Sequence, residues 1–124
     1  NYKFISCFTP GGADQTPGNK ALSQYADTIG RGEMKQDINY VAGWITGQMA
    51  AEALAKLGKN PTRARLIESL SKGFTVNSQG LAAPFSYTPT NNTGPVVFKL
   101  FGYDFAVNKF KAYGDFADYE KYTR

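Results

Sequence analysis

The feature that most constrains the fold of this chain is the segment 37–58, which reads DINYVAGWITGQMAAEALAKLG. Its apolar side chains recur at helical spacing, as at Val41 and Ile45. The Asp37 carboxylate can accept hydrogen bonds from the free amide groups of a first turn, and Gly58 can take the left-handed conformation that ends a helix. We therefore predict one continuous helix of about 30 Å over this segment.

This predicted helix also carries a stripe of small residues, Gly43, Gly47 and Ala51, spaced four positions apart. Small side chains at that spacing let another backbone approach closely. Because charged side chains are few, we expect the helix to be buried against a sheet or against other helices. Gln48 and Glu52, together with the glycines, make it too polar for a membrane span.

The same rules predict further helices and strands on either side of this segment. Two more helices are expected, at residues 19–29 and at residues 60–73, where Asn60 would cap the helix and Pro61 would occupy its first position. The predicted strands, recognised by alternation and by flanking turn residues, are at residues 2–8, 81–87, 95–101 and 105–110.

A turn at residues 102–104 would join the last two strands as a hairpin. The tail, residues 112–124, would form a final short helix with Phe116, Tyr119 and Tyr122 along one side. The predicted fold class is therefore α/β, in the order strand, three helices and then three strands. These helices are apolar on more faces than so few strands can cover, so we expect the chain to be part of a larger α/β protein.

Composition narrows the possible functions. With 42% apolar and 15% aromatic residues among 124, the chain can build one modest folded domain. Its net charge of +4 comes from scattered side chains, so we predict no nucleic-acid binding, which requires clustered basic residues. The sequence has no histidine and a single cysteine, Cys7, which excludes an internal disulfide and the usual zinc sites. Without a paired base or a metal site, we predict neither an enzyme nor a cofactor.

Three groups of short motifs follow one another along the chain. The first group is YVAGW at 40–44, AAEAL at 50–54 and LG at 57–58. The second is PTR at 61–63 and LIESL at 66–70, and the third is GL at 80–81, PFSYTP at 84–89 and NTG at 92–94. Over essentially the whole chain, this ordered series resembles the C-terminal portion of type I periplasmic solute-binding proteins, the branched-chain amino-acid-binding family of ABC importers.

The resemblance implies a two-lobed, periplasmic-binding-protein-like type I fold. Residues 1–12 would supply a strand and an interlobe crossover, residues 13–87 part of the first lobe, and residues 88–124 another crossover, a hairpin and the tail of the second lobe. It also implies a periplasmic or extracellular, membrane-tethered protein that binds a small amino acid or an aromatic or aliphatic carboxylate between its lobes. Such a protein delivers the ligand to an ABC permease and catalyses no reaction.

The resemblance makes three residues candidate ligand contacts. Tyr40 lies at the start of the long predicted helix, where members of the family often place an aromatic side chain against the ligand. A helix N-terminus also favours an anionic group. Phe8 and Thr9 border the first crossover and could line the cleft. Each of the three has an alternative role in packing, and Trp44 is expected in the core.

An alternative interpretation is a free-standing small α/β module that binds another protein through its exposed apolar helix faces. In either case, the uncovered faces predict that the isolated chain self-associates. Because the sequence starts directly on a predicted strand, we also expect it to be an excised or processed piece of a longer protein.

Overall fold

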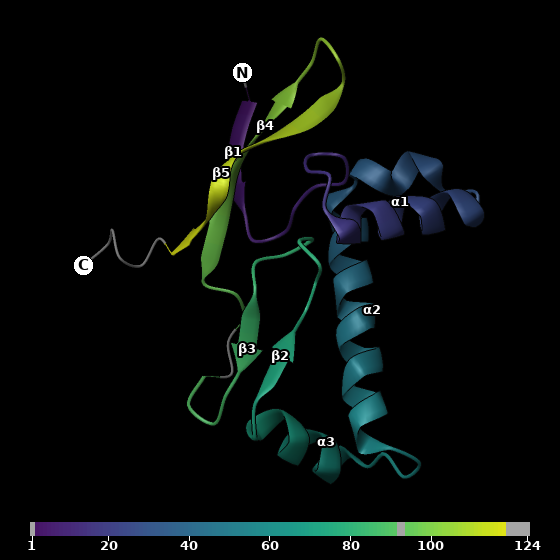
Figure 1. Ribbon diagram of the computed structural model, residues 1–124, viewed down its shortest axis with the longest axis vertical. Helices are drawn as coiled ribbons and strands as arrows, with labels where there is room; N and C mark the ends of the chain where they lie inside the picture. Colours follow the sequence, from purple (N-terminus) through teal and green to yellow (C-terminus); the bar gives the residue numbers. More distant parts are fainter. Residues whose placement is uncertain (1, 92–93, 119–124) are drawn as a thin grey trace.

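The computed structural model describes residues 2–91 and 94–118 and has a mixed α/β architecture (Figure 1). Within these residues it contains three α-helices, one 3-10 helix and two small antiparallel sheets. A three-stranded sheet lies at one end of the molecule, and the helices and a two-stranded sheet make up the rest (Figure 1). We call the second part, residues 17–87, the helical body.

The long helix predicted from the sequence is confirmed. Helix α2 spans Ile38–Leu57 and is capped by Asp37, whose carboxylate accepts a hydrogen bond from the Asn39 amide at 2.8 Å. Gly58 follows the helix with a φ of 66°. The cap and the terminating glycine are local signals, which explains why the sequence located both ends of the helix.

Helix α1 forms where a helix was predicted but begins earlier, since it spans Pro17–Thr28. The Thr16 hydroxyl caps it by accepting a hydrogen bond from the Asn19 amide at 3.2 Å. Asn19 is therefore inside the first turn rather than at its start. A short 3-10 helix, η1 (Gly32–Gln36), connects α1 to α2.

Helix α3, Arg63–Ser71, begins later than predicted. Thr62 caps it by accepting a hydrogen bond from the Arg65 amide at 3.3 Å, so the assignment of the cap to Asn60 and the first position to Pro61 is wrong. The Asn60 carbonyl instead accepts a hydrogen bond from the Arg65 guanidinium at 2.5 Å. The Arg65 side chain thus binds the loop that precedes the helix and holds it outside the first turn.

The three-stranded sheet joins the start of the chain to its last described strands. Strand β1 (Tyr2–Ser6) pairs antiparallel with β4 (Val97–Asp104), which pairs in turn with β5 (Lys109–Asp118). Phe101 of β4 is fully buried, and its ring stacks on that of Phe4 with the ring centres 5.7 Å apart. Such cross-strand aromatic pairs are a main source of stability in a small sheet.

The predicted α/β class is confirmed, but within the described residues four strands follow the helices rather than three. The additional strand is β2 (Phe74–Val76), in a stretch for which no strand is predicted. It pairs antiparallel with β3 (Phe85–Tyr87), so only the end of the predicted strand at residues 81–87 is part of a sheet. Three alternating residues are too short a pattern to be recognised from the sequence.

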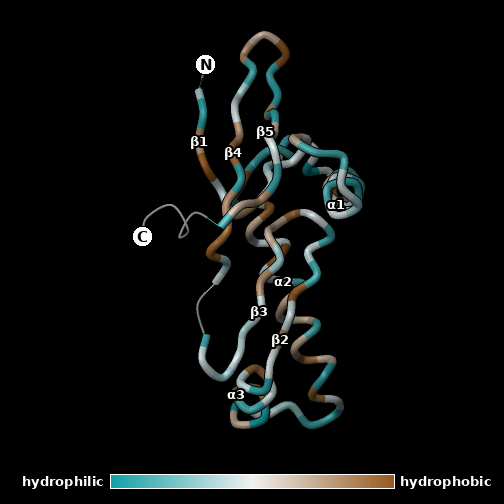
Figure 2. Tube along the Cα trace, turned by 60° about the vertical axis from the view of Figure 1, so that its left-hand side comes forward, coloured by the Kyte–Doolittle hydropathy of each residue, from teal (hydrophilic) through white to brown (hydrophobic). Residues whose placement is uncertain are grey.

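The turn of the final hairpin lies at residues 105–108, with Asn108 at a φ of 53°, and the predicted turn at residues 102–104 is wrong. Gly102 leaves room inside β4 for the Tyr113 ring, since a Cβ at this position would lie 2.9 Å from that ring and 3.2 Å from the Tyr2 carbonyl oxygen. The observed turn projects away from the rest of the molecule and is largely hydrophobic (Figure 2). The glycine that suggested a turn therefore serves a close approach between neighbouring strands.

The predicted short helix in residues 112–124 is wrong for its described part. Strand β5 continues to Asp118 and includes Phe116. Tyr119 and Tyr122, the other members of the predicted helix face, lie outside the described residues. Pairing with β4 satisfies the backbone groups of this segment, and this non-local pairing overrides the local helical spacing of the aromatic residues.

The helical body contains two small hydrophobic clusters that lie on either side of the middle of α2. The first cluster consists of Leu22, Val41, Ile45, Leu81 and Ala82, and the second consists of Ala53, Phe74 and Val76. Met49 packs against both clusters and links them. The helical body therefore has a continuous but narrow core along one side of α2.

The opposite side of α2 is uncovered, so the expected burial of this helix against a sheet or other helices is met on one side only within the described chain. Gly43 and Gly47 are exposed, and a Cβ built on either would meet no atom within 4 Å. Ala51 is exposed as well, and Leu54 is 49% exposed. As for membranes, no helix in the part of the chain that the structure describes has both the length and the hydropathy needed to cross one.

Candidate functional site

The junction between the three-stranded sheet and the helical body is the candidate functional site. After β1 the chain runs antiparallel to the loop that connects β2 and β3. The Thr9 amide donates a hydrogen bond to the Leu81 carbonyl at 2.7 Å, and the Ala83 amide donates one to the Cys7 carbonyl at 3.1 Å. The segment that leaves the sheet is thus bound to the helical body by backbone hydrogen bonds.

Two of the predicted ligand contacts, Phe8 and Thr9, lie in this segment. Phe8 forms an isolated β-bridge with Ala82 and packs against the first hydrophobic cluster. Thr9 is fully buried, and its hydroxyl donates a hydrogen bond to the Gly80 carbonyl at 2.9 Å. Since the amide and the hydroxyl of Thr9 are both engaged within the chain, this arrangement gives Thr9 a structural role, and its contact with a ligand stays a prediction.

Tyr40, the third predicted contact, packs against the same cluster as Phe8. Its hydroxyl is buried and has no hydrogen-bond partner among the described residues. The same is true of Trp44 Nε1 and Gln48 Oε1, which follow one and two turns further along α2. A buried polar atom without a partner lowers stability, and these three atoms come from successive turns of the same helix.

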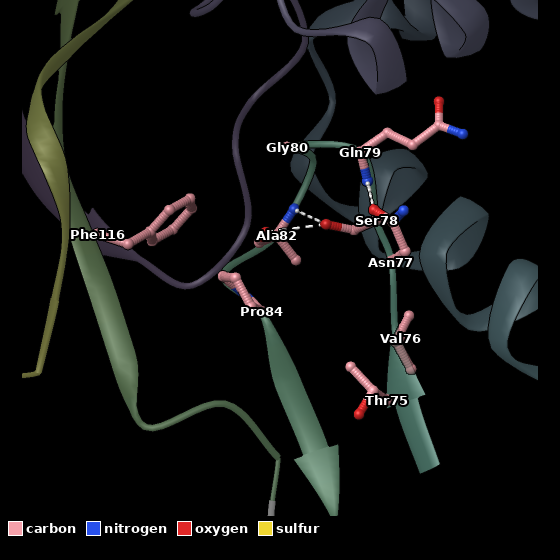
Figure 3. A pocket seen from close by; sticks show the side chains of 9 residues that line it. All are labelled: Thr75, Val76, Asn77, Ser78, Gln79, Gly80, Ala82, Pro84 and Phe116. Atoms are coloured by element: carbon pink, nitrogen blue, oxygen red, sulfur yellow. Dashed lines mark hydrogen bonds between the residues drawn. The ribbon is translucent and has the colours of Figure 1, made fainter.

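A hollow of about 310 Å³ lies at the junction, between Phe116 of β5 and the loop from β2 to β3 (Figure 3). Phe116 points into it, toward Ala82 and Pro84 (Figure 3). The Ser78 hydroxyl holds the loop in shape, because it accepts a hydrogen bond from the Ala82 amide at 2.9 Å and donates one to the Ala82 carbonyl at 2.8 Å. The other lining residues are Thr75, Val76, Asn77, Gln79 and Gly80.

A charge pair crosses the junction. Lys99 Nζ of β4 lies 2.6 Å from Oδ2 of Asp14, which precedes α1, and Lys99 is only 7% exposed. The Lys99 ammonium also lies 5.6 Å from the centre of the Phe116 ring. None of these three residues was predicted as a site residue, and Phe116 was expected on the face of a helix instead. The available signal was a lysine in the middle of the apolar run VVFKLF at residues 96–101, where a charge needs a partner once it is buried.

Cys7 lies in the junction as a free, half-buried thiol. Burial raises the pKa of this thiol above its ordinary value of 9.0, and a backbone hydrogen bond lowers it by a smaller amount. The reactive thiolate is therefore scarce near neutral pH. Within residues 2–91 and 94–118, no three His, Cys, Asp or Glu side chains gather closely enough to hold a metal ion.

Alkylation of Cys7 by iodoacetamide is expected to follow a pKa above 9.0 in the folded chain and a lower one in the urea-unfolded chain. Because folding raises this pKa, the thiol's contribution to stability is fully present below the unfolded pKa and is lost as the pH rises through the folded pKa. Alkylation rates measured by mass spectrometry across this pH range test the difference. Cys7→Ser should abolish this part of the alkaline destabilisation, whereas equal pKa values in the two states would contradict the prediction.

Over residues 2–91 and 94–118, these observations define a mixed α/β fold with three α-helices and two small sheets, whose junction carries a hollow and a partly buried ion pair. In comparisons with known proteins, the chain matches no protein-family model, no curated protein and no solved structure. The family resemblance of the sequence therefore supports a proposal about function and does not assign the chain to a family.

Proposed function

We propose that this chain is part of an extracytoplasmic solute-binding protein of the type I periplasmic-binding-protein kind. Such a protein captures a small amino-acid-like or carboxylate ligand between two lobes and delivers it to an ABC permease. The observation that carries the proposal is the row of buried, unpaired polar atoms that begins at the Tyr40 hydroxyl, on the same cluster as Phe8. The Tyr40 hydroxyl is closed off from solvent in this structure, so a ligand with a polar end and an apolar body would reach it and the Phe8 ring only when the chain around them opens.

The arrangement of the strands supports this proposal. β1 pairs with the hairpin of β4 and β5, although the whole helical body separates them in the sequence. A chain that leaves one lobe, builds part of another and then returns would produce this pairing. Gly12 lies just after the chain leaves the sheet, is exposed and has no atom within 4 Å of the position of a Cβ, and a residue of this kind can absorb a rotation between lobes.

The chemistry near Tyr40 favours a ligand that accepts a hydrogen bond. The Asp37 carboxylate already caps the N-terminus of α2, and the Tyr40 hydroxyl is a polar group near this end that no described residue binds. A phenolic hydroxyl can donate to a carboxylate, while the Phe8 ring offers an apolar contact. Amino acids and aromatic or aliphatic carboxylates have both properties.

The proposal is tested on the full-length product of the gene that encodes this chain. Leucine, phenylalanine and benzoate are screened by thermal shift, because a ligand that binds only the folded state raises the melting temperature. For a ligand that binds, Tyr40→Ala is expected to weaken the calorimetric affinity by roughly tenfold, or about 1.4 kcal/mol.

Two further variants make the test specific. Tyr40→Phe keeps the ring and removes only the unpaired hydroxyl, so it should weaken binding without lowering stability. Tyr2→Ala removes a tyrosine that is 61% exposed on the sheet and should leave affinity unchanged. If none of the three compounds shifts the melting temperature, the proposed ligand class is wrong, and an unchanged affinity in Tyr40→Ala would remove this residue from the site.

A second candidate function, a protein-interaction module, is favoured by the uncovered side of α2. Gly43, Gly47 and Ala51 leave that side open, and Trp44 and Gln48 present their unpaired atoms beside it. Sedimentation velocity separates the candidates. Both candidate functions predict that the isolated chain associates in a concentration-dependent way. If the chain is part of a solute-binding protein whose other parts cover α2, the full-length product should be monomeric. A full-length product that still associates through this side would favour the interaction module.

A further inference from the structure

We propose that the Asp14–Lys99 ion pair is a latch that fixes the angle between the helical body and the three-stranded sheet, and with it the width of the hollow at their junction. This inference goes beyond ligand capture. It rests only on contacts at the junction, so it does not depend on the identity, or even the existence, of the proposed ligand.

Asp14 is held on the side of the helical body. The Asn19 side-chain amide of α1 donates a hydrogen bond to the Asp14 carbonyl at 2.9 Å. The Gly18 amide donates one to the Gln79 carbonyl at 3.0 Å, which attaches the start of α1 to the loop that lines the hollow. The approach is close, since a Cβ on Gly18 would lie 2.7 Å from the Ser78 carbonyl oxygen. Asp14, α1 and this wall of the hollow are therefore connected.

Lys99 is held on the opposite side, where the pairing of β4 with β5 is irregular. Phe98 lies opposite Ala117 and Leu100 lies opposite Tyr113, so β5 bulges at residues 114–116 next to Lys99. Gly114 has a φ of 68°, which allows the bulge. A bulge changes the direction of the side chains that it carries.

This bulge brings Phe116 both to the hollow and to Lys99. The Phe116 ring lines the hollow, and the Lys99 ammonium lies 5.6 Å from its centre. Lys99 in turn reaches Asp14, 85 residues away in the sequence, at 2.6 Å. The ion pair itself lies outside the hollow and connects its two walls indirectly, one through the start of α1 and the other through the bulge that carries Phe116.

Burial gives this pair its effect on the angle of the junction. The Lys99 side chain is only 9% exposed, whereas that of Asp14 is 30% exposed. A mostly buried ammonium that loses its carboxylate partner is unfavourable, because little water reaches it to compensate for the lost charge. Arrangements in which the sheet rotates away from α1 would separate Lys99 from Asp14 and are therefore disfavoured. Removing either charge should make these arrangements accessible while leaving the helices and strands themselves intact.

The experiment measures the distance between the two parts of the molecule in the full chain. Spin labels are attached through Lys59→Cys, beyond the end of α2, and Lys109→Cys, at the start of β5, in a Cys7→Ser background. Both labelled positions are exposed and lie far from the junction, so a small rotation produces a large change in their separation. The reference protein should give one narrow distance peak by pulsed electron spin resonance.

The variant Lys99→Met keeps the apolar stem of the side chain and removes the charge, and it is expected to shift or broaden the distance peak. Asp14→Asn keeps the size of the side chain and the backbone carbonyl that binds Asn19, and it should also shift or broaden the distance peak. If Lys99→Met does not fold, Asp14→Asn alone tests the role of the ion pair. The matched control is Lys72→Met, which breaks the exposed ion pair with Glu68 on α3 and should leave the peak unchanged. An unchanged narrow peak in a folded Lys99→Met or Asp14→Asn protein would overturn the proposal.

Discussion

Replacing Gly11 by alanine is expected to lower the free energy of unfolding by about 3 kcal/mol or more, because it overpacks a site that cannot relax easily. A Cβ at this position would lie 1.3 Å from the carbonyl oxygen of Lys35 and 2.5 Å from its carbonyl carbon. Both atoms belong to the backbone of η1, so rotation of a side chain cannot relieve the overlap. Either η1 or the segment that leaves β1 must move, which should disturb the junction as well as lower stability. Urea denaturation followed by circular dichroism measures the loss.

The neighbouring glycine provides the control for this prediction. Gly12 has a φ of 80°, and a Cβ there would meet no atom within 4 Å. Gly12→Ala should therefore cost only the backbone strain of the left-handed conformation, about 1–2 kcal/mol. If Gly11→Ala proves no more destabilising than Gly12→Ala, the close contact between this segment and η1 does not exist in solution.

The sequence predicted helix α2 correctly and missed strand β2 for the same physical reason. Helix α2 is determined by residues within its own length: Asp37 at its start, Gly58 at its end and apolar residues at helical spacing between them. Strand β2 depends instead on β3, which lies beyond an intervening loop. Local patterns therefore predicted the helix and missed the strand.

The final hairpin shows how a correct local signal can be misinterpreted. Gly102 is a residue typical of turns, yet here it allows the Tyr113 ring of the neighbouring strand to lie across β4. The actual turn places Asn108 in the left-handed conformation, which asparagine tolerates well. The register between β4 and β5 determines whether the turn falls at residues 102–104 or at residues 105–108. The residue pattern of one strand does not specify that register.

The candidate site was predictable only in part. The family resemblance predicted Tyr40 and Phe8 as ligand contacts. In the structure, both side chains pack against the first hydrophobic cluster. The pairing of Asp14 with Lys99 could not be predicted, because nothing in the sequence relates two residues that far apart. A lysine inside an apolar strand indicated that Lys99 needs a partner, but only the fold determines which carboxylate supplies it.

Phe101→Ala is expected to lower the stability of the three-stranded sheet by about 3–5 kcal/mol, the usual cost of truncating a fully buried phenylalanine. The loss should be confined to the sheet, because neither cluster of the helical body contains Phe101, whose ring stacks on Phe4 of β1 instead. Hydrogen exchange should therefore show lost protection in β1, β4 and β5 while α2 stays protected. Phe105→Ala, which truncates a ring that is 72% exposed in the hairpin turn and lies edge-to-face on the Tyr103 ring, is the control and should lower stability by at most about 1.5 kcal/mol. If α2 loses protection together with the strands, the two parts unfold as one cooperative unit, and the junction is stronger than its hydrogen bonds and single ion pair indicate.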